Sequence, residues 1–218
     1  MDIRVDENTV IVFDLDDTLY NELDYLKSAY LEIAKILAPL NYRELFSTMF
    51  SLYRDKKNVF QYLNNHYDVE ISSLIANYRN HQPSIKMFRG ALELLESIKK
   101  NKGRLGIITD GRINTQMAKI KALQISHIID YIVISEEIGT EKPNVQNFEL
   151  IEQKLEGNFY YYIADNLKKD FITPKKMGWK TIALIDNGKN IHHDSNIHRM
   201  EEYCPEHFVF GYEEFKII

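Results

Sequence analysis

The sequence predicts an α/β protein with a doubly wound parallel sheet and an all-helical segment inserted after the first strand. Three observations predict this architecture. Residues 10–13 (VIVF) form a continuous apolar run, which is typical of a strand covered on both faces of a parallel sheet. After Gly90, helical and strand patterns alternate, as they do in successive βα units. No convincing strand pattern occurs between Tyr20 and Gln82, so this segment is expected to be helical.

The first part of the chain is expected to contain one strand, over residues 9–14, followed by helices. Apolar residues recur at helical spacing from Glu22 to Ala38, and Pro39 ends this first helix. Three more helices are predicted over residues 42–53, 57–65 and 69–80. Pro83 then marks the boundary of the helical segment.

The second part of the chain is expected to build the rest of the sheet. Strands are predicted over residues 104–110, 131–135, 159–165, 180–185 and 207–211. Helices are predicted over residues 91–100, 113–123, 145–155 and 168–177, the last with a break near Pro174. We therefore expect residues 1–19 and 86–218 to form the α/β core and residues 20–85 to form a separate helical domain.

The composition of the chain narrows the classes of function. Hydrophobic residues make up 44% of the 218 residues, enough for a large core. The formal net charge is −5 and no basic stripe stands out, which argues against a nucleic-acid partner. Cys204 is the only cysteine, so no intrachain disulfide can form and a reducing compartment is expected. With no signal-peptide pattern and no apolar run of membrane-spanning length, the sequence predicts a cytoplasmic protein without a membrane partner.

Polar residues follow three of the predicted strands at the points where these strands end. They are DLDDT (residues 14–18), TDG (109–111) and ADN (164–166). In a parallel sheet these ends meet at one edge, where ligands bind. The loop GTEKPN (139–144) could bring Lys142 to the same edge. Burying ionised carboxylates is costly without compensation, and a pocket of carboxylates, a hydroxyl and a lysine suits Mg²⁺ and a phosphoryl group.

These residues, in this order, resemble the motifs of the haloacid dehalogenase superfamily, most of whose members are phosphatases. The motif positions are Asp14, Asp16, Thr18, Thr109, Lys142, Asp165 and Asp170. The resemblance covers nearly the whole chain and includes the helical insertion, which corresponds to the family's cap domain. Two positions differ from the common pattern: Ala164 replaces a frequent glycine, and Asp17 stands where glycine is also common. Taken singly, each motif residue could be an ordinary turn or surface residue, and it is their order that favours a site.

The resemblance implies a catalytic role for two carboxylates and a metal site. Asp14 would be the nucleophile that becomes an aspartyl phosphate, and Asp16 would be the general acid and then the general base. Asp14, Asp165 and the backbone carbonyl of Asp16 would bind Mg²⁺.

The resemblance also implies a set of residues around the substrate phosphate. Thr109, Lys142 and the backbone at Asp110 and Gly111 would hold the phosphoryl oxygens. Asp170 would support them by ordering metal-bound water or Lys142.

The implied function is Mg²⁺-dependent hydrolysis of a small phosphorylated metabolite, a nucleotide or a sugar phosphate. The strings TDGRINTQMAKI and VISEEIGTEKPN look most like those of pyrimidine 5′-nucleotidases and N-acylneuraminate-9-phosphate phosphatases. A haloacid dehalogenase is disfavoured, because that branch lacks the acid found here as Asp16. A sugar-phosphate mutase remains open, as does a catalytically inactive binding or regulatory protein on the same fold.

Two further segments bear on what the protein binds. The helical cap is expected to close over the site and to select the leaving group through residues such as Tyr20, Asn21, Tyr25 or Arg54. The stretch IHHDSNIHR (191–199) invites a zinc interpretation, but no second ligand cluster occurs at the right spacing. A surface loop is therefore favoured.

Overall fold

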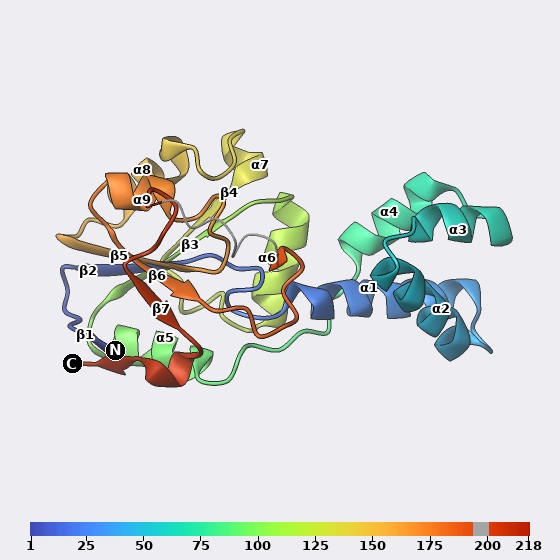
Figure 1. The fold of residues 1–218 in the computed structure, drawn as a ribbon, viewed down its shortest axis with the longest axis horizontal. Coiled ribbons are helices and arrows are strands. Elements are labelled where there is room, and N and C mark those ends of the chain that lie inside the picture. The colour runs from blue at the N-terminus through green and yellow to red at the C-terminus, as the bar shows by residue number, and fades with distance from the viewer. Residues whose placement is uncertain (194–200) are drawn as a thin grey trace. The chain divides into compact units, whose positions relative to one another are not determined.

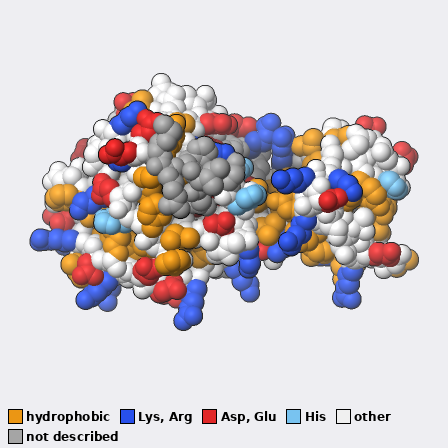
Figure 2. Space-filling model, in the orientation of Figure 1, with side chains coloured by type: hydrophobic (Ala, Val, Ile, Leu, Met, Phe, Trp, Pro, Cys, Tyr) orange, Lys and Arg blue, Asp and Glu red, His pale blue; other side chains and the backbone are white. Residues whose placement is uncertain are grey.

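The computed structural model describes residues 1–193 and 201–218 (Figure 1). The chain forms two compact units. Met1–Glu22 and Lys86–Ile218 make an α/β unit, and Leu23–Ile85 make a helical unit. No helix in the described part of the chain is both long and apolar enough to cross a membrane. On the face drawn in Figure 2, lysine and arginine side chains are spread among acidic ones.

A six-stranded, all-parallel sheet forms the centre of the α/β unit, which confirms the predicted fold class. Its strands are β2 (Thr9–Phe13), β3 (Arg104–Thr109), β4 (Tyr131–Ile134), β5 (Phe159–Ala164), β6 (Lys180–Leu184) and β7 (His207–Val209). Two short strands that the sequence did not predict, β1 (Asp2–Ile3) and β8 (Lys216–Ile217), pair in parallel as a separate small sheet.

The strand order β4-β3-β2-β5-β6-β7 places the reversal of the sheet beside β2. From β2 the chain moves to β3 and β4 on one side, then returns to β5 on the other. Val12 of β2 is in register with Gly106 of β3 and with Tyr162 of β5. Because ligands bind where the strand order reverses, the carboxyl ends of β2 and β5 are the expected place for a site.

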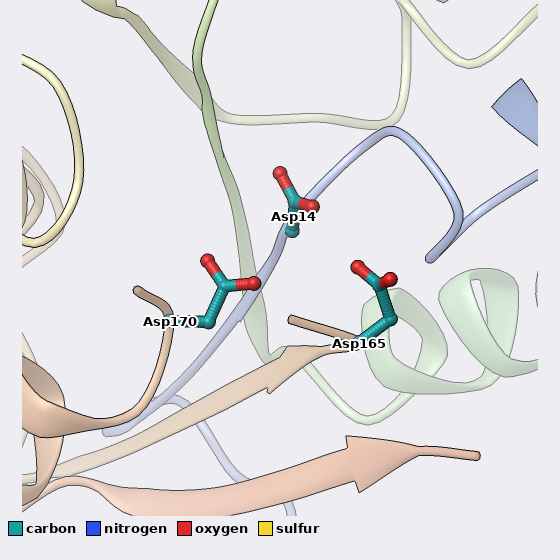
Figure 3. Close-up of side chains that lie close together, drawn as sticks. All are labelled: Asp14, Asp165 and Asp170. Carbon is teal, nitrogen blue, oxygen red and sulfur yellow. The ribbon is translucent and has the colours of Figure 1, made fainter. Parts of the chain in front are cut away.

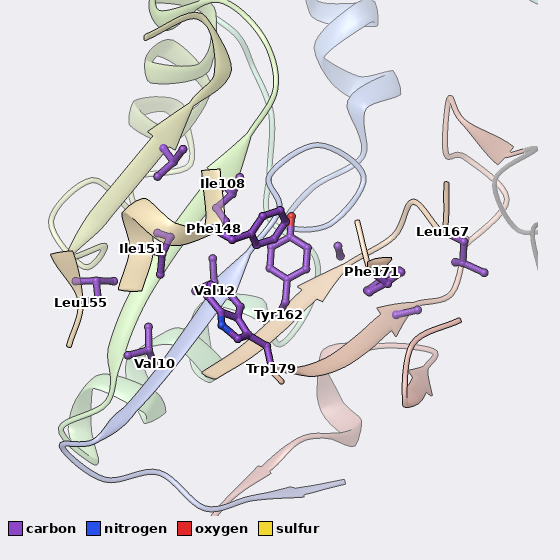
Figure 4. Close-up of a cluster of buried hydrophobic side chains, with 13 residues drawn as sticks. Val10, Val12, Ile108, Phe148, Ile151, Leu155, Tyr162, Leu167, Phe171 and Trp179 are labelled. Atoms are coloured by element: carbon purple, nitrogen blue, oxygen red, sulfur yellow. The ribbon is translucent and has the colours of Figure 1, made fainter. Parts of the chain in front are cut away.

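Helices complete the α/β unit. They are α5 (Ala91–Lys100), α6 (Ile113–Ala122), α7 (Ser135–Ile138), α8 (Val145–Lys154), α9 (Ile172–Lys176) and the 3₁₀ helix η2 (Tyr212–Glu214). Figure 4 shows the buried cluster on one face of the sheet, to which alternate residues of β2, Val10 and Val12, contribute. The Phe148 ring of α8 lies edge-on to Tyr162 and Trp179, with centroids 5.3 and 5.6 Å away. This packing fixes β5 and hence the polar residues that follow it.

The helical unit has a hydrophobic core of its own. It is built from α1, which begins at Glu22 and ends at Leu37, α2 (Tyr42–Arg54), α3 (Val59–His66) and α4 (Ile71–Asn80). Most residues of this core that share a helix lie three or four positions apart, and the core consists of Leu26, Tyr30, Ile33, Ala34, Leu45, Met49, Val59, Leu63 and Leu74. This spacing buries one face of each helix and leaves the other polar. Every residue of this unit is described, and none lies in a strand.

Two element predictions were wrong in detail. Pro174 does not break a helix but lies in the first turn of α9, where its missing N–H would have had no partner within the helix. The helix therefore starts at Ile172 rather than at Lys168, and Asp170 lies before it. Ser135 does not end β4 but begins α7, which Gly139 ends in a left-handed conformation.

Candidate active site

Three buried aspartates gather at the carboxyl ends of β2 and β5. Asp14 directly follows β2, Asp165 directly follows β5, and Asp170 comes from the loop between β5 and α9. One carboxylate oxygen from each lies within 4.8 Å of the others, and Figure 3 shows the three side chains close together. The sequence placed these three residues in one site, and the fold brings them together.

Lys142 connects two of these carboxylates. Its ammonium nitrogen lies 2.6 Å from Asp14 Oδ1 and 2.8 Å from Asp170 Oδ1, and none of its side chain is exposed. It also donates to the Tyr162 hydroxyl at 3.2 Å. A fully enclosed ammonium with several acceptors is fixed in direction as well as position, so Lys142 orients the Asp14 carboxylate.

The triad holds more negative charge than Lys142 neutralises. Burial raises the pKa of Asp14 to about 6, although Lys142 opposes the shift. Burial, Asp14 and Asp170 together hold the pKa of Asp165 well above its ordinary value. The oxygens of Asp165 accept from Thr18 at 3.4 Å and from Asn190 at 2.8 Å, which fixes this carboxylate without neutralising it. A divalent cation fits this oxygen-rich, under-neutralised cluster.

Asp16 has the opposite electrostatic setting. Its two carboxylate oxygens lie 2.7 and 2.8 Å from the Lys119 ammonium of α6. It also accepts hydrogen bonds from the Tyr20 hydroxyl and, at 3.0 Å, from Gln116 Nε2. Burial raises the pKa of Asp16, but Lys119 and these donors outweigh burial and the pKa lies below its ordinary value.

Gln116 links Asp16 to the residues at the end of β3. Its amide nitrogen donates to the Thr109 hydroxyl and to the Asp110 carbonyl, the latter at 3.1 Å. The backbone of Gly111 has a φ of +138°, and a Cβ there would lie 3.2 Å from Gln116. Only glycine lets the chain turn this closely past Gln116.

The loop after β3 uses its polar groups differently from what the resemblance implies. The Asp110 carboxylate accepts from the Lys142 amide at 3.1 Å and from Lys169 Nζ at 2.8 Å. The Gly111 amide, expected to face a phosphoryl oxygen, donates to the Ser135 hydroxyl at 2.8 Å. A phosphoryl oxygen would therefore have to replace Ser135 to reach this amide.

The backbone conformation at Asp17 explains why either glycine or aspartate suits this position. Its φ is 54°, a left-handed conformation that glycine adopts freely and that aspartate tolerates better than most residues. Its two carboxylate oxygens accept from the amides of Glu22 and Ile191, both at 2.8 Å. Asp17 thus connects the start of α1 to the loop that follows β6.

A pocket of about 280 Å³ opens above these groups within the α/β unit. The predicted residues in its lining are Asp14, Asp16, Thr109, Asp110, Gly111 and Asp165. Lys142 and Asp170 are buried beneath the lining, against Asp14.

The structure adds functional candidates that the sequence analysis missed. Lys119 and Gln116 contact Asp16, while Glu22 and Lys169 line the pocket. The one available signal for Gln116 and Lys119 was their spacing of three residues, which puts two polar groups on one face of the helix after β3.

The first histidine of the histidine-rich stretch lies at the pocket. His192 contributes to the pocket lining. Residues 194–199 of this stretch lie outside the described residues, so the choice between a surface loop and a zinc site stays a prediction.

Comparison with known protein families shows to which family the chain belongs. The profile of the haloacid dehalogenase-like hydrolases matches residues 11–184, which include the inserted helices and the motif residues from Asp14 to Asp170. The chain belongs to this family. The resemblance read from the motifs is thereby confirmed.

Named relatives within the family are distant in sequence. The chain is 27% identical over 194 residues to a glyceraldehyde 3-phosphate phosphatase of Methanocaldococcus jannaschii, an alignment covering 80% of this chain and 84% of the relative. It is 26% identical over 133 residues to the pyrimidine 5′-nucleotidase YjjG of Escherichia coli, covering 54% of this chain and 56% of that one. The crystal structure of the haloacid dehalogenase-type hydrolase YfnB of Bacillus subtilis matches with a TM-score of 0.66 at 17% identity, over 97% of both chains. This last likeness shows the shared fold.

Proposed function

We propose that this hydrolase is a phosphatase that cleaves the phosphate monoester of a small metabolite through an aspartyl phosphate. The observation that carries the proposal is the setting of Asp14. Its carboxylate is buried at the end of β2, held by Lys142 on one oxygen, and open to the pocket. The phosphatase names of the relatives from M. jannaschii and E. coli support the same reaction class.

The first half of the reaction transfers the phosphoryl group to Asp14. A carboxylate oxygen of Asp14 attacks phosphorus while the bond from phosphorus to the substrate's alcohol oxygen breaks. Asp16 must carry a proton to give one to the departing oxygen, although Lys119 and the other donors hold its pKa low before substrate binds. Since both oxygens of Asp16 are engaged by Lys119, Gln116 and Tyr20, at least one of these contacts must yield to the leaving group.

The second half releases phosphate. A water molecule attacks the phosphorus of the aspartyl phosphate, Asp16 takes the proton from this water, and the bond between phosphorus and Asp14 breaks. The ammonium of Lys142 and the Thr109 hydroxyl would stabilise the negative charge on the transferred group. Asp170, 2.8 Å from Lys142, holds that lysine in place.

The residues Asp14 and Asp165, with the backbone carbonyl of Asp16, would hold Mg²⁺. The cation would neutralise part of the charge between the Asp14 carboxylate and the incoming phosphate, which both carry negative charge. The three carboxylates buried around the Lys142 ammonium, with the raised pKa values of Asp14 and Asp165, support this assignment.

Phosphate release from p-nitrophenyl phosphate tests the reaction and the metal together. The purified chain should release inorganic phosphate with Mg²⁺, lose this activity in EDTA, and regain it when excess Mg²⁺ is added. Full activity in EDTA would contradict the metal assignment. With a sugar phosphate as substrate, conversion to an isomer without free phosphate would indicate a mutase instead.

We also assign the helical unit, Leu23–Ile85, the role of a substrate-selecting cap. The assignment rests on its insertion between β2 and β3 of the catalytic unit and on its separate hydrophobic core. Exchange of this segment for the cap of a relative with another preference should change the ranking of a panel of phosphorylated metabolites. An active chimera with the original ranking would place specificity in the α/β unit. The reducing compartment inferred from Cys204 makes the cytoplasm the proposed location.

A further inference from the structure

The pocket carries a charge imbalance that bears on which leaving group it admits. Among the residues that the structure describes, its lining includes one lysine, Lys169, one histidine, His192, and seven carboxyl groups, those of Asp14, Asp16, Asp17, Glu22, Asp110, Glu141 and Asp165. Lys169 lies 2.8 Å from the Asp110 carboxylate. The two nearby buried lysines also lie against carboxylates, Lys142 on Asp14 and Asp170, and Lys119 on Asp16. Each of these three lysines of the α/β unit therefore already neutralises part of the site.

The bound cation would neutralise only part of the negative charge in the lining. Asp14 and Asp165 are the proposed ligands of the divalent cation, which would neutralise that end. Glu22 lies elsewhere in the lining, at the start of α1, and the charges that act on it most are those of Asp16, Lys119 and Asp17. Lys119 is shared with Asp16, so it cannot fully neutralise both carboxyl groups.

The surroundings of Glu22 disfavour a negative charge. Burial raises the pKa of Glu22 most, Asp16 adds to the rise and Lys119 opposes it, and the resulting pKa is about 8. A site that disfavours the negative form of its own side chain also disfavours a carboxylate or phosphate brought in by a substrate. A hydroxyl group meets no such penalty, because a carboxyl group can accept or donate a hydrogen bond to it.

We infer that Glu22 is a specificity-determining residue that admits phosphate monoesters of uncharged, hydroxyl-bearing alcohols and rejects those with a second anionic group beside the ester. The inference rests on the proposed phosphatase function of the same pocket. It predicts that pyrophosphate and phosphorylated carboxylic acids are poor substrates, because their leaving groups are anions.

Two substrates of the same carbon skeleton test this inference. Glycerol 3-phosphate and 3-phosphoglycerate each carry one phosphate monoester, and a CH₂OH group in the first replaces a carboxylate in the second. Assays at pH 8.5 with Mg²⁺ keep Glu22 mostly ionised. The wild-type kcat/KM for glycerol 3-phosphate should exceed that for 3-phosphoglycerate by roughly ten- to a hundred-fold, because ionised Glu22 repels the carboxylate of 3-phosphoglycerate.

Variants at position 22 locate the source of this preference. Glu22→Gln removes the charge with little change in shape, and Glu22→Lys reverses it. The ratio of the two kcat/KM values should fall in Glu22→Gln and fall further, by about ten-fold or more from wild type, in Glu22→Lys. Glu137→Gln removes the same charge from an exposed site outside the pocket lining and should keep the wild-type ratio.

The outcomes separate this inference from the proposed function. Hydrolysis of p-nitrophenyl phosphate without a preference for glycerol 3-phosphate would overturn the inference and leave the phosphatase function standing. An unchanged ratio in both folded Glu22 variants would overturn the role of Glu22. Failure to hydrolyse any of the three compounds would overturn the proposed function and this inference with it.

Discussion

Asp14 and Asp16 are two residues apart in the chain, both are largely enclosed and both contact a lysine, yet their pKa values are displaced in opposite directions. Burial raises the pKa of Asp14 to about 6, and Lys142, which Asp14 shares with Asp170, does not offset this rise. Asp16 has Lys119 at both oxygens and two further donors, and its pKa falls. The number of carboxylates per cation, and not burial alone, decides the direction.

This difference in charge balance gives Asp14 and Asp16 different roles in the site. The Asp14 region is short of positive charge, so it can take up a cation and a phosphoryl group. The Asp16 region is balanced by neighbouring donors, so its carboxylate is positioned before substrate arrives. Changes at Asp14 should therefore remove the reaction, whereas changes around Asp16 should change its dependence on the leaving group.

The largest effect is expected for Asp14→Asn. An amide cannot readily form the acyl phosphate, and unaided monoester hydrolysis is slower than the enzymatic reaction by factors of up to ~10²¹. Turnover of p-nitrophenyl phosphate should fall below detection while circular dichroism shows a folded protein. Substantial activity in the purified variant would contradict the assignment of Asp14 as nucleophile.

A smaller, substrate-dependent loss is expected for Asp16→Asn. Attack by Asp14 remains possible, but protonation of the leaving oxygen is lost, which is typically worth 10²–10⁴-fold. Aryl phosphates, whose leaving groups need little protonation, should lose less than alkyl phosphates. Equal losses in kcat/KM on both classes would argue against the general-acid role.

The smallest effect is expected for Lys119→Met. Loss of the ammonium should raise the pKa of Asp16, so its acid form should persist to higher pH. The alkaline limb of the kcat/KM profile for an alkyl phosphate should then move up by about one pH unit. Lys119→Arg keeps the charge and should keep the limb in place. If the profiles of Lys119→Met and wild type coincide, Lys119 does not control the ionisation of Asp16.

The fold and the centre of the site could be predicted because their signals are local. A buried strand followed at once by an acid describes Asp14 and Asp165, and the parallel sheet brings such strand ends together without further information. Asp170 could be placed in the same site because only a short loop separates it from Asp165. The proline in α9 was misjudged because its position in the helix decides its effect, and the sequence left the first residue of that helix uncertain.

The supporting residues could not be predicted in the same way. Lys119 and Gln116 look like ordinary polar residues of a surface helix, and their burial depends on how α6 packs beside Asp16. Glu22 looks like a common acid of a helix's first turn. Its place in the pocket follows from the turn at Asp17, whose carboxylate accepts a hydrogen bond from the Glu22 amide.

The enclosure of Lys142 has a consequence for the chemical reactivity of the protein. Acylating and alkylating reagents react with an unprotonated amine that they can reach. Lys142 has no exposed side-chain surface. Burial lowers its pKa, but Asp14 and Asp170 outweigh burial and hold that pKa well above its ordinary value. Burial and protonation thus both protect Lys142 from acetylation and methylation. Any labelling of Lys142 would show that its ion pairs with Asp14 and Asp170 had broken and that the side chain had become exposed.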